Sequence, residues 1–380
     1  MDPADFADGP GRIDEYEGLP CYTPAPLPPA FEYGDDLVRA YGDALYALGR
    51  LATLERDLDN PNLVIAPFVH REAAMSSQVE GTNVTISDIY RHEVGSAPRR
   101  SAAANDDVRE AYNYVDAVKR GFERLDDGSS IDQELVCELH DLLLGGVRGD
   151  EHRPGELRDV PVYIGSRGGS LEEASFVPAS PEFVPLLLDG LFSYVRRGEY
   201  PPLVDVALVH YQFEAIHPFR DGNGRLGRLL IMLQLYDVGL LPGPYLYLSA
   251  YFRRYGEAYR ENLLAVSTEG AWNEWATFVL NAIAEQAIDG YDCGMRLMEL
   301  RERYRATFPN APTARELVDY LFEQPYVTGP RAVEATGRSK PSVYEAIERL
   351  EAEGMIEEVT GNRRNRVYEA PAVLDALRST

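Results

Sequence analysis

Apolar residues recur every three to four positions along most of the chain, which is the spacing of an α-helix that buries one face. The pattern therefore predicts a mainly α protein. One polar tract, residues 216–228, lies between two strongly apolar helical runs, so we expect a loop held by core helices. Helices are expected at residues 35–56, 68–82, 106–125, 131–144, 182–197, 203–216, 225–240, 259–267 and 272–305, the last as one helix or as two that meet near Gly290.

Proline and glycine interrupt this helical pattern. Residues 1–34 hold closely spaced prolines and little periodicity, which predicts an extended arm on the surface. Residues 160–177 contain two short β-prone runs around Gly168–Gly169, which predict a hairpin. Gly81 is expected to end the helix at 68–82 as a C-terminal cap. The N-caps expected for the next two helices are Asn105, Asp106 or Asp107, and Ser130.

Beyond a proline-containing linker at 308–312, the pattern becomes that of a different module. Three short helices are expected there, followed by a β-hairpin. This arrangement resembles a winged helix-turn-helix in which residues 339–353 form the recognition helix. The predicted elements are helices at 313–323, 329–336 and 339–353 and strands at 355–359 and 366–369.

The C-terminal module predicts one of two kinds of partner. Arg363, Arg364 and Arg366 gather on the wing, and Arg338 and Lys340 lie at the start of the recognition helix, so duplex DNA is one. The module has no net basic charge, however. Docking of a target protein, or of a second copy of the chain in a homodimer, fits the sequence equally well.

The charge of the chain indicates its surroundings. The formal net charge is −25, and Lys119 and Lys340 are the only lysines among 37 basic residues. An excess of carboxylates with few lysines is typical of a surface adapted to concentrated salt, where screening removes self-repulsion. A halophilic host is one interpretation; an ordinary acidic protein from a GC-rich genome, which also favours arginine over lysine, is the other.

Cysteine usage and hydropathy predict a cytoplasmic protein. Cys21, Cys137 and Cys293 lie far apart and are odd in number, which fits neither a disulfide framework nor zinc spacing. No apolar run reaches the roughly 18 residues that a membrane span needs, and the N-terminus is acidic. We therefore expect no membrane partner and no signal peptide.

The polar loop combines residue types that suit phosphate chemistry. Gly222 and Gly224 lack side chains, so backbone N–H groups can turn toward an anion at the N-terminus of the following helix. Asp221 offers the oxygen ligand that Mg²⁺ prefers. His217 titrates near neutral pH and can remove a proton from a hydroxyl. The loop therefore predicts a site where a base, a metal ligand and an anion site lie together.

Two arginines follow these residues on the next helix. Arg225 and Arg228 are three positions apart, so both guanidinium groups can reach one polyphosphate. The loop is not a Walker A loop, because the lysine followed by Ser or Thr is missing.

The order of these residues matches His-x-Phe-x-Asp/Glu-Gly-Asn-Gly-Arg-x-x-Arg, the signature of the Fic family of nucleotidyl transferases. The resemblance implies a Fic helical core that transfers AMP from ATP to a Ser, Thr or Tyr hydroxyl of a protein. It implies Mg²⁺ as the cofactor and pyrophosphate as the leaving group. The matching positions are His217, Phe219, Asp221, Gly222, Asn223, Gly224, Arg225 and Arg228.

The resemblance also implies a role for each residue. His217 is the general base, Phe219 anchors it in the core, and Asp221 holds the metal ion. Backbone groups of the glycine-rich loop bind phosphate, and the two arginines bind the outer phosphates. The expected ATP-binding residues are Gly222, Asn223, Gly224, Arg225, Leu226, Gly227, Arg228 and Tyr259, of which Tyr259 either lies near the nucleobase or is an ordinary core aromatic.

A second motif lies upstream of the loop. Ser76, Glu80 and Gly81 match the Ser/Thr-x-x-x-Glu-Gly/Asn inhibitory motif of many Fic proteins. The resemblance implies that Glu80 pairs with Arg228 and keeps ATP from seating productively. The hairpin at 160–177 resembles the Fic flap, which aligns a target segment by main-chain pairing and is tolerant of its sequence. The expected flap residues are Val162, Tyr163, Ile164 and Gly165.

Taken as a whole, the sequence predicts three parts. They are an N-terminal arm and helices with the inhibitory motif at 1–110, a Fic catalytic core with a β-hairpin flap at 111–306, and a winged helix-turn-helix at 312–380. Two other functions fit the same residues. One is a transcription regulator whose core only senses a nucleotide; the other is removal of AMP, or transfer of another phosphate-containing group, by the same site.

Overall fold

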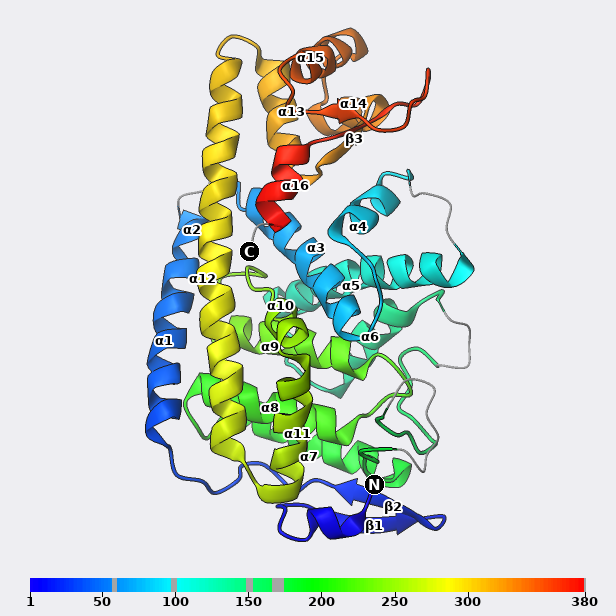
Figure 1. Ribbon diagram of the computed structural model, residues 1–380, viewed down its shortest axis with the longest axis vertical. Helices are drawn as coiled ribbons and strands as arrows, with labels where there is room; N and C mark the ends of the chain where they lie inside the picture. The colour runs from blue at the N-terminus through cyan, green and yellow to red at the C-terminus, as the bar shows by residue number, and fades with distance from the viewer. Residues whose placement is uncertain (57–59, 97–100, 148–152, 166–173, 379–380) are drawn as a thin grey trace.

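The computed structural model describes residues 1–56, 60–96, 101–147, 153–165 and 174–378, and it confirms a mainly α fold. Its longest element, α12 (Trp272–Thr307), runs along one side of the molecule, and α1 (Asp35–Leu51) packs against it (Figure 1). Gly290 does not break α12. A Cβ at this position would lie 3.2 Å from a methyl group of Leu51, so the glycine allows α1 to approach closely.

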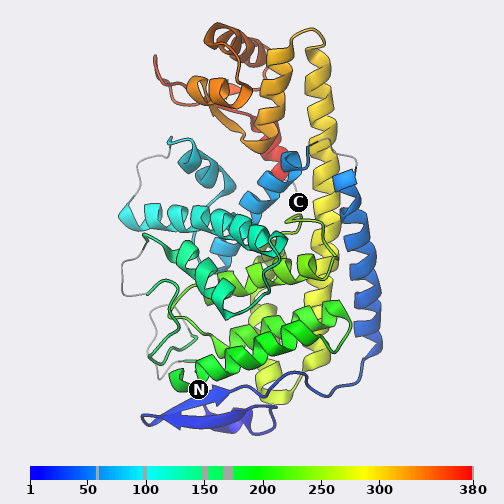
Figure 2. The same cartoon turned by 180° about the vertical axis from the view of Figure 1, so that it is seen from behind.

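Two helices form the centre of the core. In α8 (Pro202–Ile216) and α9 (Asn223–Asp237) nearly every residue is buried, as their continuous apolar sequences predict. Figure 1 shows both in the middle of the molecule beside α12, and Figure 2 shows the same region from behind. The remaining helices of this part are α2 (Thr53–Arg56), α3 (Asn62–Val79), α4 (Ile86–Glu93), α5 (Ala102–Asp126), α6 (Gln133–Leu144), α7 (Val184–Arg197), α10 (Ser249–Arg254) and α11 (Gly256–Glu269), with 3₁₀ turns at Pro3–Phe6 and Pro181–Phe183.

Several predicted helix starts are wrong. α5 begins earlier, because Ser101 accepts a hydrogen bond from the N–H of Ala104 (3.3 Å), and α6 is capped by Asp132 rather than Ser130. α3 begins at Asn62 and includes Pro67, which the sequence placed before the helix. α5 also runs without a break across residue 110, where the sequence analysis placed a domain boundary. Serine, asparagine and aspartate can all cap a helix, and several of them lie near the starts of α5 and α6, so the sequence alone did not single out one.

The N-terminal arm is not simply extended. Residues Arg12–Tyr16 (β1) and Leu19–Thr23 (β2) form an antiparallel hairpin, with Tyr16 opposite Leu19. Glu17 and Gly18 between them both have positive φ (53° and 81°), as a two-residue turn of this kind requires. The proline-rich composition of the first 34 residues hid this short alternating segment.

The hairpin predicted at 160–177 is described only in part. Ile164 and Phe176 form an antiparallel bridge, whereas Gly168–Gly169 lies outside the described residues. β2 adds to the other side of this segment, because the N–H of Tyr22 donates to the carbonyl of Val177 (2.8 Å). The N-terminal arm therefore packs against the candidate flap and is hydrogen-bonded to it.

The C-terminal module has the predicted three helices and hairpin. It also contains a third strand and a last helix that the sequence analysis did not predict, and the strand order is β3-β5-β4. Arg363 and Arg364 are exposed between β4 and β5. The elements are α13 (Pro312–Glu323), β3 (Tyr326–Thr328), α14 (Gly329–Thr336), α15 (Lys340–Ala352), β4 (Glu357–Glu358), β5 (Val367–Glu369) and α16 (Pro371–Arg378).

This module docks on the N-terminal helices rather than standing apart (Figure 1). α13 packs on α3, and Arg91 of α4 forms an ion pair with Glu369 at 3.1 Å. The amide of Gln324 donates to Glu93 at 2.8 Å. In the described part of the chain, no helix has both the length and the apolar character required to cross a membrane.

Candidate active site

The loop between α8 and α9 holds the candidate base in an unusual backbone conformation. His217 follows the last residue of α8 and adopts the left-handed region, with φ 50° and ψ 63°. Its N–H still donates to the carbonyl of Phe213 (3.0 Å), so the chain turns sharply as the helix ends. A residue other than glycine in this region is uncommon, and such residues cluster at functional sites.

Hydrogen bonds from within and outside the loop fix its shape. The side chain of Asn223 bonds both ways with the backbone of Phe219, accepting from its N–H (2.8 Å) and donating to its carbonyl (2.9 Å). Phe219 is fully buried, as predicted for an anchor, and its ring stacks on His140. Because Nδ1 of His140 accepts from the N–H of Gly155 (2.9 Å), Nε2 carries the proton and donates to the carbonyl of Asp221 (2.9 Å).

A buried arginine holds the other end of the loop. Arg158 is 3% exposed, and its Nε donates to the carbonyl of His217 at 2.8 Å. Its remaining nitrogens donate to other backbone carbonyls, including those of Ile216 (3.3 Å) and Ala179. Burial lowers the pKa of Arg158 to about 10, so it stays charged at neutral pH. Neither Arg158 nor His140 is predicted as a site residue from the sequence, because each acts through a contact with a distant segment.

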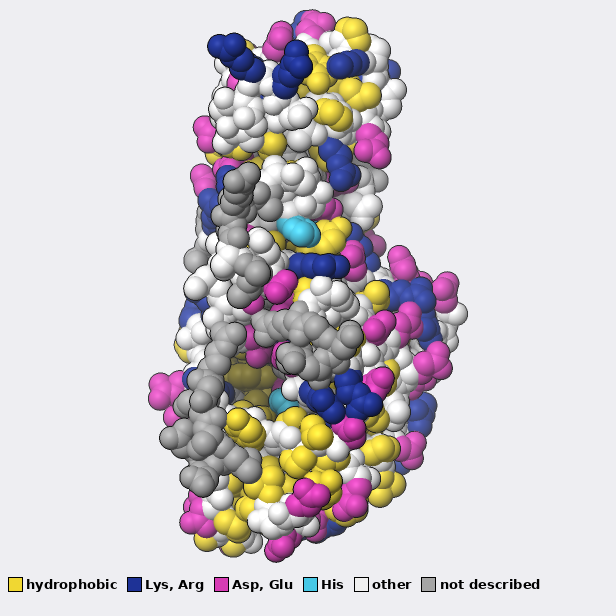
Figure 3. Space-filling model, turned by 90° about the vertical axis from the view of Figure 1, so that its right-hand side faces the viewer, with side chains coloured by type: hydrophobic (Ala, Val, Ile, Leu, Met, Phe, Trp, Pro, Cys, Tyr) yellow, Lys and Arg dark blue, Asp and Glu magenta, His cyan; other side chains and the backbone are white. Residues whose placement is uncertain are grey.

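The loop opens into a cavity of about 420 Å³. Figure 3 shows this face of the molecule hollowed beside a histidine, with apolar side chains inside the hollow. A volume of this size falls within the range of small-molecule sites. Residues from α11 and from four other regions meet there; the four are Val79 and Glu80 at the end of α3; Ile164, Ser175 and Phe176 of the candidate flap; Tyr211, Glu214 and Ala215 of α8 with His217 directly after it; and Gly224 and Arg228 of α9. Tyr259, Arg260, Glu261, Leu263, Leu264 and Ser267 of α11 complete the lining.

His217 is neutral in this environment. Burial lowers its pKa to about 4, and the positive charge of Arg158 acts in the same direction. Nδ1 lies 3.3 Å from the carbonyl of Glu214, which can only accept, so we assign the proton to Nδ1. Nε2 then has a lone pair with which to accept a proton. A neutral imidazole is the form that a general base requires.

We therefore predict that the acid limb of the pH profile lies well below the ordinary histidine pKa of about 6.5. A base is lost as pH falls through its pKa, so a pKa lowered to about 4 leaves His217 competent throughout pH 5–8. The measurement is the pH dependence of kcat/KM, in a Glu80→Gly variant, for the AMP transfer that the resemblance implies, since this ratio reports groups of the free enzyme.

The same cavity contains one other group that titrates in that range. Burial raises the pKa of Glu214 to about 7. The profile should therefore be repeated with Glu214→Gln, which removes that ionisation. A limb near pH 6.5 that persists in both proteins would contradict the assignment of His217.

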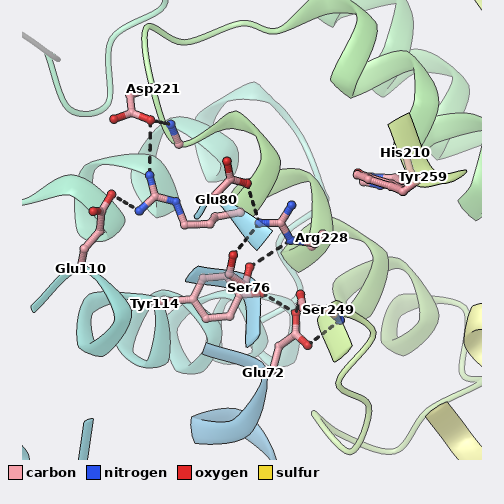
Figure 4. Close-up of polar contacts among 12 residues, drawn as sticks. Glu72, Ser76, Glu80, Glu110, Tyr114, His210, Asp221, Arg228, Ser249 and Tyr259 are labelled. Carbon is pink, nitrogen blue, oxygen red and sulfur yellow. Dashed lines mark hydrogen bonds and ion pairs between the residues drawn. The ribbon is translucent and has the colours of Figure 1, made fainter. Parts of the chain in front are cut away.

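Arg228 and the predicted inhibitory motif are in contact. Arg228 is 1% exposed; its Nη2 donates to a carboxylate oxygen of Glu80 (2.8 Å) and to the carbonyl of Ser76 (3.0 Å), and its Nε donates to the Ser76 hydroxyl (3.0 Å) (Figure 4). Glu80 follows the last residue of α3, and Gly81, with φ 86°, ends the helix as predicted. The motif is therefore positioned by a helix end and pairs with Arg228.

Electrostatics hold this pair in its charged form. Burial alone would raise the pKa of Glu80, but the charges of Arg228 and Arg225 outweigh it and lower the pKa. One carboxylate oxygen also lies 2.5 Å from the position of a Cβ built on Gly224, in the first turn of α9. The Glu80 carboxylate thus lies against the N-terminus where an anion would bind, and only glycine leaves room for it.

Arg225 points away from the cavity. Its guanidinium pairs with the buried carboxylate of Glu110 on α5 and lies 3.4 Å from Asp221 (Figure 4). Burial lowers its pKa to about 10. The sequence placed Arg225 and Arg228 on one helix face, yet only Arg228 lines the cavity. Leu226 and Gly227 are likewise buried in α9, where Gly227 packs closely against Glu214.

The helix that carries Glu80 is itself anchored by a buried carboxylate. Glu72 of α3 is 1% exposed and accepts hydrogen bonds from the N–H and the hydroxyl of Ser249 and from the hydroxyl of Tyr114 (3.3 Å) (Figure 4). Burial raises its pKa. Contacts with α5 and α10 therefore hold the part of α3 that positions Ser76 and Glu80. The sequence signal for Glu72 was its place on the same face as Ser76, four residues earlier.

Tyr259 is a core aromatic that also lines the cavity, and its place near a nucleobase stays a prediction. It lines the cavity, but it is 6% exposed and its ring lies among Phe252, Trp275 and Phe278. Its hydroxyl lies 2.9 Å from Nε2 of the buried His210 (Figure 4). Tyr259 is thus part of the aromatic core that forms one wall of the cavity.

Asp221 has the chemistry expected of a magnesium ligand. Its carboxylate accepts from the N–H of Gly222 (2.7 Å) and is partly exposed at the mouth of the loop. Within the described ranges, no three His, Cys, Asp or Glu side chains converge as a metal-binding cluster. A single carboxylate fits Mg²⁺ when phosphate oxygens and water supply the remaining ligands. The residues therefore fit an ion that would arrive with a nucleotide.

Comparisons with known proteins agree with this geometry. Residues 38–123 match the Fic/DOC family N-terminal model, and residues 130–235 match the Fic/DOC family model. The chain belongs to the Fic/DOC family. It is 33% identical over 119 residues to protein adenylyltransferase fic-1 of Caenorhabditis elegans, covering 30% of this chain and 21% of that protein. It is 41% identical over 69 residues to a probable protein adenylyltransferase of Aquifex aeolicus, covering 18% of this chain and 22% of that protein. The chain thus spans about a fifth of the length of these curated relatives.

Solved structures show the same fold. A Fic family protein from Desulfovibrio desulfuricans G20 superposes with a TM-score of 0.59 at 19% identity, covering 90% of this chain and 98% of that one. Fic-1 of C. elegans superposes with a TM-score of 0.51 at 18% identity, covering 70% and 74%. The likeness to the first extends over nearly the whole chain, including regions outside the two family matches.

Proposed function

We propose that this protein transfers AMP from ATP to a Ser, Thr or Tyr hydroxyl of a protein. The observation that carries the proposal is the meeting of three groups in one cavity. These are the neutral imidazole of His217, the N-terminus of α9 at Gly224, and the guanidinium of Arg228. Together they provide a base, an anion site and a cation for outer phosphates. The names of the relatives support this chemistry.

Each step can be given to a group of this chain. The target hydroxyl loses its proton to Nε2 of His217 as its oxygen attacks the α-phosphorus of ATP. The bond from that phosphorus to the bridging oxygen breaks, and pyrophosphate leaves. The first helical hydrogen bond of α9 joins the N–H of Leu226 to Gly222. The N–H groups of Asn223 and Gly224 thus precede it and are oriented to stabilise charge on the α-phosphate.

We propose that Asp221 holds the Mg²⁺ that accompanies ATP. A bound ion would neutralise charge on the phosphates as pyrophosphate departs. The contribution of the chain is to orient the carboxylate, through the hydrogen bond from Gly222 and the bond between His140 and the Asp221 carbonyl.

Glu80 is the proposed inhibitor of this reaction. Arg228 donates to Glu80 and Ser76 at once, and its side chain is almost fully buried. The guanidinium has a fixed fork of donors, so it cannot serve the Glu80 carboxylate and the γ-phosphate of ATP together. With Glu80 in place, ATP would lack its outer-phosphate contact, and the resting protein would be nearly inactive.

We also propose roles for the flap, for the C-terminal module and for the acidic surface. Main-chain pairing along Val162–Gly165 would align the target segment beside His217. The exposed Arg363 and Arg364 would contact DNA phosphates or a docking protein. The acidic surface would suit a cytoplasm with concentrated salt.

Mass spectrometry of the protein incubated with Mg-ATP tests the activity. We expect a Glu80→Gly variant, alone or with a cell extract, to yield peptides carrying one AMP group. ATP labelled in the adenine ring should label protein, whereas ATP labelled on the γ-phosphate should not. Label from the γ-phosphate would indicate kinase-like transfer, and label from neither would leave the site without transferase activity.

A further inference from the structure

A second cavity lies away from the one that holds His217. It measures about 520 Å³ and is formed where α3, α4, α10, α12 and α16 meet. Figure 1 shows α16 descending beside α12 toward α3 at this junction. Among the residues that the structure describes, none lines both cavities. The lining residues are Arg71, Met75, Ile86, Ala250, Arg253, Arg254, Gln286, Asp289, Leu377 and Arg378.

The charge of this cavity is opposite to that of the chain. Four arginines and one aspartate line it, although the chain carries a net charge of −25. Asp289 pairs with Arg71 at 3.2 Å. Two arginines at the rim pair with carboxylates outside the lining. Arg254 pairs with Glu285 at 2.5 Å, and Arg378 pairs with Asp375 at 3.6 Å. These two are exposed surface pairs, which hold their partners weakly and can release them to a ligand.

Two further side chains in the cavity are left for a ligand: one can bind an anion and the other needs a hydrogen-bond donor. Arg253 is exposed at the rim and, within the described chain, has no carboxylate partner. Gln286 is 2% exposed, and its side-chain oxygen has no hydrogen-bond partner among the described residues. A buried amide without a partner is costly unless a ligand or water satisfies it. A ligand whose phosphate meets the arginines, and whose organic part carries a hydroxyl or amino donor for this oxygen, meets both requirements.

The rest of the wall is apolar. Met75, Ile86, Ala250 and Leu377 supply it, and their side chains come from four different helices. An inorganic anion would leave this surface unused, whereas an organic group would cover it. Arginine is the side chain best matched to phosphate oxygens, which it binds through paired donors.

We propose that this cavity binds an organic phosphate of up to nucleotide size, with the phosphate on Arg253 and Arg378 and the organic group against the apolar wall. The site is distinct from the one that we assign to ATP. Because Met75 directly precedes Ser76, a ligand here also contacts the helix that places Glu80 on Arg228. A ligand that binds this arrangement stabilises it, so occupancy should hold α3 in the position seen here.

Calorimetric titration of the full chain with 1-naphthyl phosphate tests the site. We expect saturable binding by the wild type and binding weakened about tenfold or more by Arg253→Ala, since one charge-assisted contact is lost. Arg253 has an exposed side chain, so this substitution should leave the fold intact, which circular dichroism can verify. Hydrogen exchange of residues 71–80 should slow when the probe is bound.

A matched variant separates the two cavities. Arg260 is an exposed arginine that lines the His217 cavity on α11, and Arg260→Ala should bind the probe as the wild type does. 1-Naphthol and inorganic phosphate, the two halves of the probe, should each bind more weakly than the whole. Absence of binding would overturn the proposal, as would loss of binding in Arg260→Ala alone. Equal binding of 1-naphthol would also overturn it, because the arginines would then contribute nothing.

Discussion

Replacing His217 by alanine is expected to lower AMP transfer by a factor of about 10²–10⁴, the usual effect of removing a general base. The neutral imidazole lines the cavity beside the N-terminus of α9. Its removal leaves the anion site and Arg228 in place, so nucleotide binding should persist. The rate of labelling from ATP marked in the adenine ring, measured in the Glu80→Gly background, gives the factor.

The backbone at this position calls for a second variant. His217 is in the left-handed region, where alanine costs roughly 1–2 kcal/mol and asparagine is better tolerated. His217→Asn should therefore keep the loop conformation and lose the base. His92→Ala, which removes a partly buried histidine from α4, serves as the matched control. Transfer by His217→Asn at the rate of its parent would refute the assignment of the base.

Replacing Glu80 by glycine is expected to raise transfer by about tenfold to a hundredfold. Arg228 donates one charge-assisted hydrogen bond to Glu80 at 2.8 Å, and such a bond contributes about 1.5–3 kcal/mol to stability. Removing it frees the guanidinium for the γ-phosphate. The carboxylate also leaves the space beside Gly224, where the α-phosphate would bind. The comparison is the initial rate of labelling by variant and wild type at the same ATP concentration.

The chain offers a close control for this experiment. Glu261 is an exposed carboxylate that lines the same cavity from α11 and, in the described part of the chain, forms no ion pair. Glu261→Gln removes one negative charge from the cavity without touching Arg228. A general electrostatic effect would raise both rates alike, whereas competition for Arg228 raises only that of Glu80→Gly. The double variant with His217→Ala should return to the basal rate.

The loop and its flanking helices were predictable because their signals are local. The apolar runs of α8 and α9 differ from the polar residues 217–224 between them, and helical spacing places Glu80 four residues after Ser76. The cap at Gly81 follows from the same local geometry. Short-range periodicity therefore sufficed to locate the loop and the helix end, whereas the roles predicted for His217 and Glu80 come from the resemblance to the Fic motifs.

The remaining parts of the site depend on contacts between distant segments. Arg225 looks like a phosphate ligand by its spacing, but the buried carboxylate of Glu110 on another helix takes its guanidinium. Arg158 and His140 act on backbone carbonyls of the loop, and the sequence carries no pattern for such contacts. Side-chain direction in a packed core is decided by the partner, which periodicity alone does not identify.

The continuity of α12 bears on how the molecule unfolds. At 36 residues it is about 54 Å long, and it passes from the core to the C-terminal module without a break. Its last turns bury Leu297, Leu300 and Tyr304 under that module, while α13 rests on α3. Melting the C-terminal module would therefore expose apolar surface on helices that belong to the core. The two parts should lose their structure together, in a single cooperative transition, although the sequence divides them at a linker.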